Sequence, residues 1–225
     1  ADLAEPLQYF GSHCDVLRVM PFLEGIPSSI HGLVFPQKTV ALRPCELMTL
    51  RRPDRTLKYC GAASYWDPPK EDRDEMRSVA VRVGEHLRRR VEYRGAFTID
   101  GVMTAEGFLP TELNTRAGAG IGTLLSGLSR LSLGSLNRAL IEGEPLDYRP
   151  DEFERLVVDT ADQHRGGGGW TVVELATDTT AKTLLTSSAG ELRAAEVDDE
   201  TAGSLSFGPG EQGGFVRFNP EASVT

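Results

Sequence analysis

The clearest pattern of hydrophobic and polar positions lies between Pro68 and Arg94, where apolar residues recur every three or four positions with charged residues between them. The apolar positions are Met76, Val79, Ala80, Val83, Leu87 and Val91. This spacing places the apolar side chains on one face of an α-helix, so the sequence predicts a long amphipathic helix over residues 68–94. Asp67 and Pro68 suit the cap and the first turn of such a helix.

Shorter apolar runs before this helix predict strands. Residues 15–20, 28–35 and 39–43 are such runs, and prolines and glycines separate them. Residues 51–70 are polar and flanked by prolines, which predicts a long loop that covers part of the molecule.

The pattern after the helix predicts a hairpin and then a second helix. Residues 96–102 and 107–114 read as two strands with a tight connection, and leucines at helical spacing predict a helix over 121–140. For the last part of the chain we expect a helix at 151–164, a linker or turn at RGGGGW, and strands at 171–177, 183–187 and 214–218. The fold class is therefore α+β, an antiparallel sheet with flanking helices on one side, followed by a small α/β unit at the C-terminus.

Composition and charge limit the classes of function. The chain has 40% hydrophobic and 25% charged residues, as is usual in globular proteins, and it lacks a run long enough for a membrane span. The net charge is −9, and all of it falls on residues 151–225, because Lys and Arg balance Asp and Glu in residues 1–150. This asymmetry predicts a domain boundary near residue 150 and argues against a nucleic-acid partner. The three cysteines lack the spacing of metal ligands, which predicts reduced thiols in a cytoplasmic protein.

The predicted hairpin carries the candidate chemistry. If Ala105, Glu106 and Gly107 form its loop, then Asp100 lies directly opposite Glu112, with their Cβ atoms about 4.5–5.5 Å apart. Like charges so placed are destabilising, whereas a divalent cation between them, with Asn114 beside them, would explain the pattern. Hard oxygen ligands of this kind suit Mg²⁺ or Mn²⁺. The alternative is a solvated hairpin face whose carboxylates never meet.

Two stretches of this hairpin, YRGAFTIDG (residues 93–101) and FLPTELNTR (residues 108–116), resemble the C-terminal catalytic lobe of ATP-grasp ligases. In that family an acidic residue, eleven further residues and the motif E-x-N-x-R close the nucleotide site. The resemblance implies that Asp100 and Glu112 hold one magnesium ion and that Glu112 and Asn114 share a second. It also implies that Arg116 steadies the transferred phosphoryl group or the acyl phosphate.

A second stretch, MPFLEG (residues 20–25), looks like the ATP-grasp hinge that holds adenine. By this resemblance Met20 and Leu23 would sandwich the ring, and the backbone from Pro21 through Phe22 to Leu23 would contact its edge. A loop crossing that packs on the core is the alternative for this segment. Arg43, on the strand after the hinge, could reach a phosphate, although such an arginine more often pairs with a neighbour such as Glu46.

The stretches FLEGIPSSIHGLVFP, YRGAFTIDG and GPGEQGGFVRF together are similar to peptide ligases of the pheganomycin type, which join a carboxylate to the amine of a peptide. The expected activity is therefore an ATP-dependent carboxylate–amine ligase, with ATP and Mg²⁺ (or Mn²⁺) as cofactors. A biotin-dependent carboxylase of the same superfamily and a non-catalytic nucleotide- or partner-binding module remain alternatives.

The resemblance also bears on partners. ATP-grasp sites take lysines from a smaller lobe before the hinge, so we expect the N-terminal part of the same enzyme to complete residues 1–150. A small-molecule carboxylate and an amine or peptide acceptor are the expected substrates, and a homo-oligomer is left open. We expect residues 151–225 to rim the amine entrance with Asp198, Asp199 and Glu200, or else to act as a solvated cover.

Overall fold

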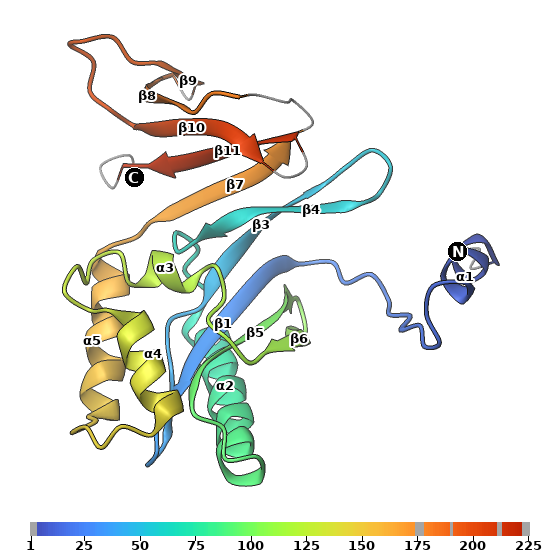
Figure 1. Ribbon diagram of the computed structural model, residues 1–225, viewed down its shortest axis with the longest axis vertical. Helices are drawn as coiled ribbons and strands as arrows, with labels where there is room; N and C mark the ends of the chain where they lie inside the picture. The colour runs from blue at the N-terminus through green and yellow to red at the C-terminus, as the bar shows by residue number, and fades with distance from the viewer. Residues whose placement is uncertain (1–3, 174–177, 190, 211–212, 222–225) are drawn as a thin grey trace.

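The computed structural model describes residues 4–173, 178–189, 191–210 and 213–221, which form a long antiparallel sheet with flanking helices (Figure 1). The strands are β1 (Ile26–Val34), β2 (Thr39–Ala41), β3 (Cys45–Arg51), β4 (Leu57–Ala63), β5 (Gly95–Thr104), β6 (Gly107–Asn114), β7 (Gly167–Val173), β8 (Ala181–Ser188), β9 (Glu191–Ala194), β10 (Gly203–Gly210) and β11 (Gly213–Pro220). The helices are α1 (Ala4–Gly11), α2 (Lys70–Arg90), α3 (Ile121–Leu124), α4 (Leu133–Glu142) and α5 (Pro150–Gln163). The order across the sheet is β6-β5-β1-β3-β4-β7-β11-β10-β8-β9, with β2 paired to β1. This architecture confirms the predicted α+β class.

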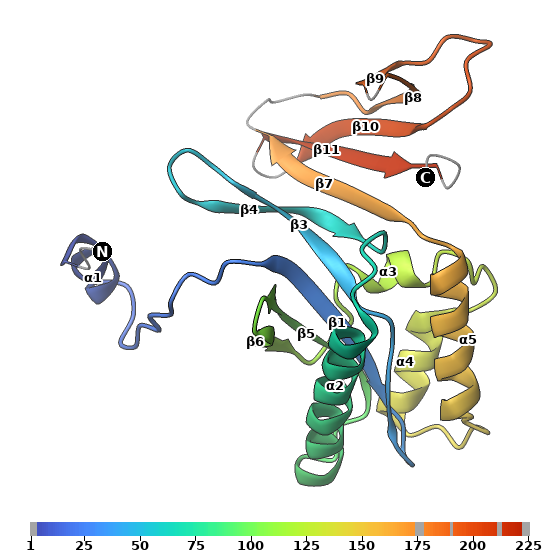
Figure 2. The same ribbon diagram turned by 180° about the vertical axis from the view of Figure 1, so that it is seen from behind.

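Helices cover both faces of the sheet around β1, and not one face as the sequence suggested (Figures 1 and 2). Successive side chains of a strand point to opposite faces, so Leu33 and Ile30 of β1 belong to different cores. Leu33 packs in the cluster that α3, α4 and α5 cover, whereas Ile30 packs in the cluster that contains Met76 of α2. The strand β1 is buried along most of its length because both of its faces are covered.

The first long helix is confirmed, and the second is wrong as a single helix. Helix α2 begins after Pro69 and ends before Val91, within the predicted range. The predicted helix 121–140 is divided into α3 and α4, and the Ser132 hydroxyl caps α4 by accepting a hydrogen bond from the Ser135 backbone N–H at 3.3 Å. Leu128 and Leu131 lie between the two helices and still pack against the core. Their spacing therefore reflects burial and not a continuous helix.

Two predictions near the N-terminus are wrong. Residues 15–20 form no strand, and the chain there is irregular and exposed before β1 begins. Residues 51–70 are largely a hairpin, in which β4 returns alongside β3. Its turn is fixed by Asp54, whose carboxylate accepts hydrogen bonds from the backbone N–H (2.9 Å) and the hydroxyl (2.6 Å) of Thr56.

The glycine run RGGGGW is not a linker, because Gly167–Gly169 begin strand β7 and pair with β4. A Cβ atom built on Gly169 would lie 2.2 Å from the carbonyl oxygen of Cys60, so only glycine allows this approach of the two strands. Strands β8 and β11 confirm two of the expected strands, while residues 174–177 of the third lie outside the described residues.

The sheet runs without interruption across the predicted boundary at residue 150, because β7 pairs with β4 on one side and β11 on the other. The division into residues 1–150 and 151–225 stays a prediction. In the described part of the chain, none of the helices combines the length and the apolar character that a membrane crossing requires.

Candidate functional site

The hairpin of β5 and β6 brings the predicted acidic residues together. Asp100 of β5 lies directly opposite Glu112 of β6, as the sequence predicted. The loop differs from the prediction, since Thr104 faces Gly107 and not Phe108. A bulge restores the predicted pairing, because Gly101 faces Pro110 and the register then shifts by one residue before Asp100.

Asp100 is half-buried at the centre of this arrangement. The Ser29 hydroxyl, opposite it on β1, donates a hydrogen bond to Asp100 Oδ1, and the Asn114 amide donates to Asp100 Oδ2 at 3.1 Å. Burial raises the pKa of the Asp100 carboxyl, and the negative charge of Glu112 raises it further, against the opposing effects of Ser29, Arg116 and Asn114. A cation beside the carboxylate would relieve this electrostatic cost.

The acids line an open cavity of about 780 Å³, which also brings in the segment that resembles the hinge. Every predicted site residue except Arg43 lines it, namely Met20, Pro21, Phe22, Leu23, Asp100, Glu112, Asn114 and Arg116. The hinge-like segment supplies an apolar part of the wall, with Met20 41% and Phe22 55% exposed. Strand β3 holds this segment through Arg51, whose guanidinium carbon lies 4.9 Å from the centre of the Phe22 ring.

The loop after β6 is fixed against buried polar groups. The backbone N–H of Gly118 donates to Thr98 Oγ1 at 2.8 Å, and that hydroxyl donates to the carbonyl of Arg116 at 3.2 Å. His31 lies beneath, fully buried, with Nδ1 2.9 Å from Thr98 Oγ1, as expected of a core histidine. A Cβ on Gly120 would lie 2.5 Å from Cys45 Sγ, so glycine lets the loop close onto this group.

The structure does not bring Arg43 to this cavity. Its side chain is fully buried, and it forms ion pairs with Asp162 of α5 (2.9 Å) and with Asp67 (3.0 Å). Neither partner is the neighbour Glu46 that the sequence suggested. A guanidinium held in this way has no free face for a phosphate, so its position indicates a structural role that ties α5 to the segment before α2.

Sequence analysis missed several residues of the site. Ser29 stands within an apolar run, and only the pairing of β1 with β5 places it on Asp100. Tyr59 and Leu57 line the cavity from β4, in the segment that the sequence predicted to be a loop. The alternation of Leu57 and Tyr59 with polar neighbours was the available signal for a strand.

The donor set at the hairpin fits a hard divalent cation. It offers two carboxylates and one amide, all with oxygen atoms, and Asp100 is oriented by Ser29. Within the described ranges, no group of three or more His, Cys, Asp or Glu side chains could hold a metal ion. A cation at this hairpin would therefore need the Asn114 oxygen and oxygens from a bound ligand.

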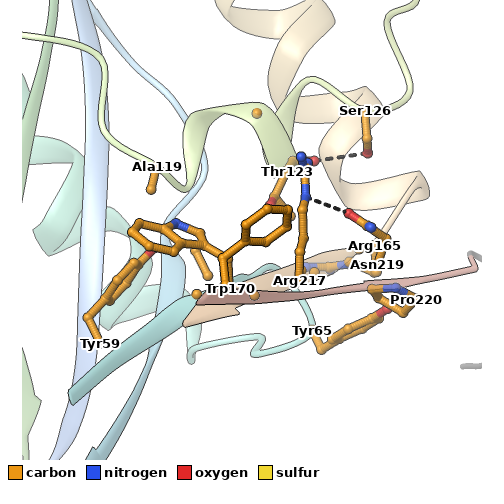
Figure 3. A pocket seen from close by; sticks show the side chains of 18 residues that line it. Tyr59, Tyr65, Ala119, Thr123, Ser126, Arg165, Trp170, Arg217, Asn219 and Pro220 are labelled. Atoms are coloured by element: carbon orange, nitrogen blue, oxygen red, sulfur yellow. Dashed lines mark hydrogen bonds between the residues drawn. The ribbon is translucent and has the colours of Figure 1, made fainter. Parts of the chain in front are cut away.

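A second cavity of about 800 Å³ lies beside the first, with Tyr59 and Ala119 lining both (Figure 3). It is formed by β4, β7 and β11 together with residues around α3. The acidic residues expected to rim the entrance, Asp198, Asp199 and Glu200, line neither cavity. They follow β9, the outermost strand of the sheet, and Asp199 pairs with Arg193 at 3.1 Å, so the rim expected from the sequence is wrong.

No protein-family model and no curated protein matches this sequence. Among solved structures, the fold is similar to N5-carboxyaminoimidazole ribonucleotide synthetase from Thermotoga maritima, with 14% identity, a TM-score of 0.49 and coverage of 97% of this chain and 54% of that chain. It is also similar to N5-carboxyaminoimidazole synthase from Aspergillus clavatus in complex with ADP and 5-aminoimidazole ribonucleotide, with 10% identity, a TM-score of 0.49 and coverage of 90% and 48%. A third is a protein from Archaeoglobus fulgidus assigned to the ATP-grasp superfamily, with 18% identity, a TM-score of 0.42 and coverage of 67% and 40%.

The chain thus spans about half the length of these structures or less.

Proposed function

We propose that this chain forms the nucleotide- and metal-binding part of an ATP-dependent ligase that joins a carboxylate to an amine through an acyl phosphate. One observation carries the proposal. A single cavity places the apolar segment Met20–Leu23 together with the opposed acids Asp100 and Glu112 and the guanidinium of Arg116. An apolar slot, a cation site and a positive charge are what an adenine ring, a metal-bound phosphate chain and a transferred phosphoryl group require.

In this proposal Asp100, Glu112 and Asn114 hold Mg²⁺, and Mn²⁺ would suit the same oxygen ligands. Bound there, the ion would neutralise the charge on the phosphates during transfer. Ser29 would keep the Asp100 carboxylate in a fixed orientation, because its hydroxyl donates to one oxygen of Asp100. Residues behind metal ligands commonly set ligand orientation in this way.

The reaction has two steps. An oxygen of the substrate carboxylate attacks the γ-phosphorus of ATP, an O–P bond forms, and the bond from phosphorus to the bridging oxygen breaks to release ADP. The amine then attacks the acyl carbon, a C–N bond forms, the C–O bond to phosphate breaks, and the amine loses a proton. Arg116 would stabilise the phosphoryl oxygens in both steps, and the fixed Gly118–Gly120 loop would shape the space for the acyl group.

The test is to incubate the complete ligase that contains this chain with ATP, Mg²⁺, hydroxylamine and a panel of ¹⁸O-labelled carboxylic acids. We expect ADP release to depend on an acid, a hydroxamate to form, and one ¹⁸O atom to appear in the released phosphate. Glu112→Gln should lower the rate by about a hundredfold, as the loss of transition-state charge stabilisation typically does. Dependence on bicarbonate and biotin, or nucleotide binding without any turnover, would contradict the proposal.

A further inference from the structure

The second cavity lies over an unusual floor, four consecutive glycines at residues 166–169. Gly167–Gly169 are strand residues, paired to β4, so this stretch of sheet has no side chains standing above it. A Cβ atom on Gly166 or Gly168 would have no neighbour closer than 3.4 Å, so the space that side chains would fill at these two positions is open toward the cavity (Figure 3). The glycine run therefore has a second consequence besides close strand pairing, because it makes room for a ligand.

Two arginines line this cavity, and they differ in whether a carboxylate pairs with the guanidinium. Arg165 is already neutralised, because its guanidinium lies 3.4 Å from an Asp67 oxygen and 3.5 Å from an Asp162 oxygen. Arg217 of β11 is exposed and forms no ion pair with any carboxylate of the described residues. Its Nε donates to Asn219 Oδ1 at 3.0 Å, which orients the side chain while its charge stays uncompensated. The cavity thus offers one free positive charge.

An aromatic wall stands next to this charge. Trp170 of β7 is directly opposite Arg217 of β11, so their side chains project from the same face of the sheet. Trp170 is 53% exposed although it is a large aromatic residue, and Phe215 lines the same cavity. An indole that is half in solvent beside an unpaired guanidinium suits a ligand with an apolar group and a carboxylate.

The two ends of the second cavity differ, because only one of them adjoins the first cavity. Tyr59 and Ala119 line both cavities, so a ligand in the second one reaches the first at that end. In the view of Figure 3, Tyr59 and Ala119 lie on one side of Trp170, with Arg217 and Asn219 on the other. A molecule bound to Arg217 by one end would therefore present its other end toward the acids and Arg116.

We infer that the second cavity binds the amine substrate, and that this substrate is a zwitterion, an amino acid or short peptide with a free carboxylate. Its carboxylate is held by Arg217, its apolar side chain lies against Trp170, and its amine points toward Ala119. This inference rests on the proposed ligase function. It predicts that the enzyme discriminates between an acceptor with a free carboxylate and the same acceptor as an amide.

The test measures binding without ATP, so it does not depend on turnover. Isothermal titration compares the dipeptide Ala-Phe with Ala-Phe amide. We expect the free acid to bind about tenfold or more tightly, since a charge-assisted bond from a guanidinium to a carboxylate is lost in the amide. Arg217→Gln should bind both peptides with the affinity of the amide, and Arg217→Lys should restore part of the preference. Arg193→Gln, an exposed arginine of β9, is the control that should keep the full preference.

Turnover then separates this inference from the proposed function. With an accepted carboxylate, Arg217→Gln should raise the KM for the dipeptide and leave the KM for ATP unchanged. Equal binding of acid and amide by the wild-type chain, or binding of neither, would overturn the assignment of Arg217 even if ADP release continues. Preference for the acid, without any acid-dependent ADP release by the complete enzyme, would instead overturn the ligase function and leave the carboxylate site in place.

Discussion

Asp100 and Glu112 face each other directly across β5 and β6, and the negative charge of Glu112 adds to burial in raising the pKa of Asp100. The pair therefore costs stability when both groups are ionised and no cation is present. Asp100 and Glu112 both line a cavity, where a cation bound between them would offset this cost.

Removing one charge should stabilise the metal-free chain. In EDTA at neutral pH, Glu112→Gln is expected to raise the free energy of unfolding by about 0.2–1 kcal/mol, because opposed like charges are removed. Asp100 has a raised pKa, so its unfavourable contribution appears as pH rises through that pKa, and the gain from the substitution should disappear in acid. Urea unfolding at several pH values measures this. The control is Glu106→Gln in the exposed turn, and destabilisation by Glu112→Gln but not by the control would contradict the prediction.

Two adjacent serines allow a matched test of how Asp100 is oriented. Ser29 donates to the Asp100 carboxylate, whereas the buried hydroxyl of Ser28 has no hydrogen-bond partner among the residues that the structure describes. Ser29→Ala should raise the pKa of Asp100 further and weaken Mn²⁺ binding by about tenfold, as the loss of a group behind a metal ligand typically does. Ser28→Ala should change neither. Carboxyl ¹³C NMR and Mn²⁺ titration give the two quantities, and equal effects of both substitutions would contradict the assignment.

His31 should make stability depend on pH. Burial lowers its pKa from 6.5 to about 4, so the folded chain keeps the imidazole neutral at pH values where the unfolded chain protonates it. Stability from this group is complete above about pH 6.5 and is lost as the pH falls toward 4. The loss is on the order of a few kcal/mol. In His31→Gln this part of the pH dependence should be missing from the unfolding free energy, and an unchanged pH profile would contradict the burial of a neutral histidine.

Arg43 should matter for stability and not for nucleotide binding. Arg43→Met removes the buried guanidinium that donates to Asp162, and the loss of a hydrogen bond to a charged group typically costs about 1.5–3 kcal/mol. A second substitution, Asp162→Asn, should recover little of the loss, because the Asp162 carboxylate keeps its ion pairs with Arg73 and Arg165. Urea unfolding of the single and double variants measures this. Unchanged stability of Arg43→Met together with weaker nucleotide binding would support the phosphate contact that the sequence suggested.

The pairing of Asp100 with Glu112 could be predicted from the sequence, although the hairpin loop assumed in that prediction is not the observed one. A three-residue loop at Gly107 gives the same register at Asp100 as the observed two-residue loop followed by a bulge. The two routes differ by one residue near the turn and agree beyond it. Loop chemistry and bulges compensate each other here, and local sequence does not reveal such compensation.

Other parts of the site depend on contacts between distant segments. Ser29 reaches Asp100, and Arg43 reaches Asp162, only through the pairing of strands and the docking of α5. The glycines of β7 look like a linker because their role is set by the backbone of β4, which lies more than a hundred residues earlier. Periodicity predicted the long amphipathic helix well, since one face of α2 is buried along its length.

The most direct test of the central claim is Mn²⁺ binding in the presence of ADP, measured by electron paramagnetic resonance. The wild-type protein should bind Mn²⁺ more tightly with ADP than without it. Glu112→Gln should weaken ADP-dependent Mn²⁺ binding by at least about tenfold, whereas Glu106→Gln should leave it unchanged. If Glu112→Gln binds Mn²⁺ with ADP as tightly as the wild type, the opposed acids of β5 and β6 do not hold the metal and the proposed site is wrong.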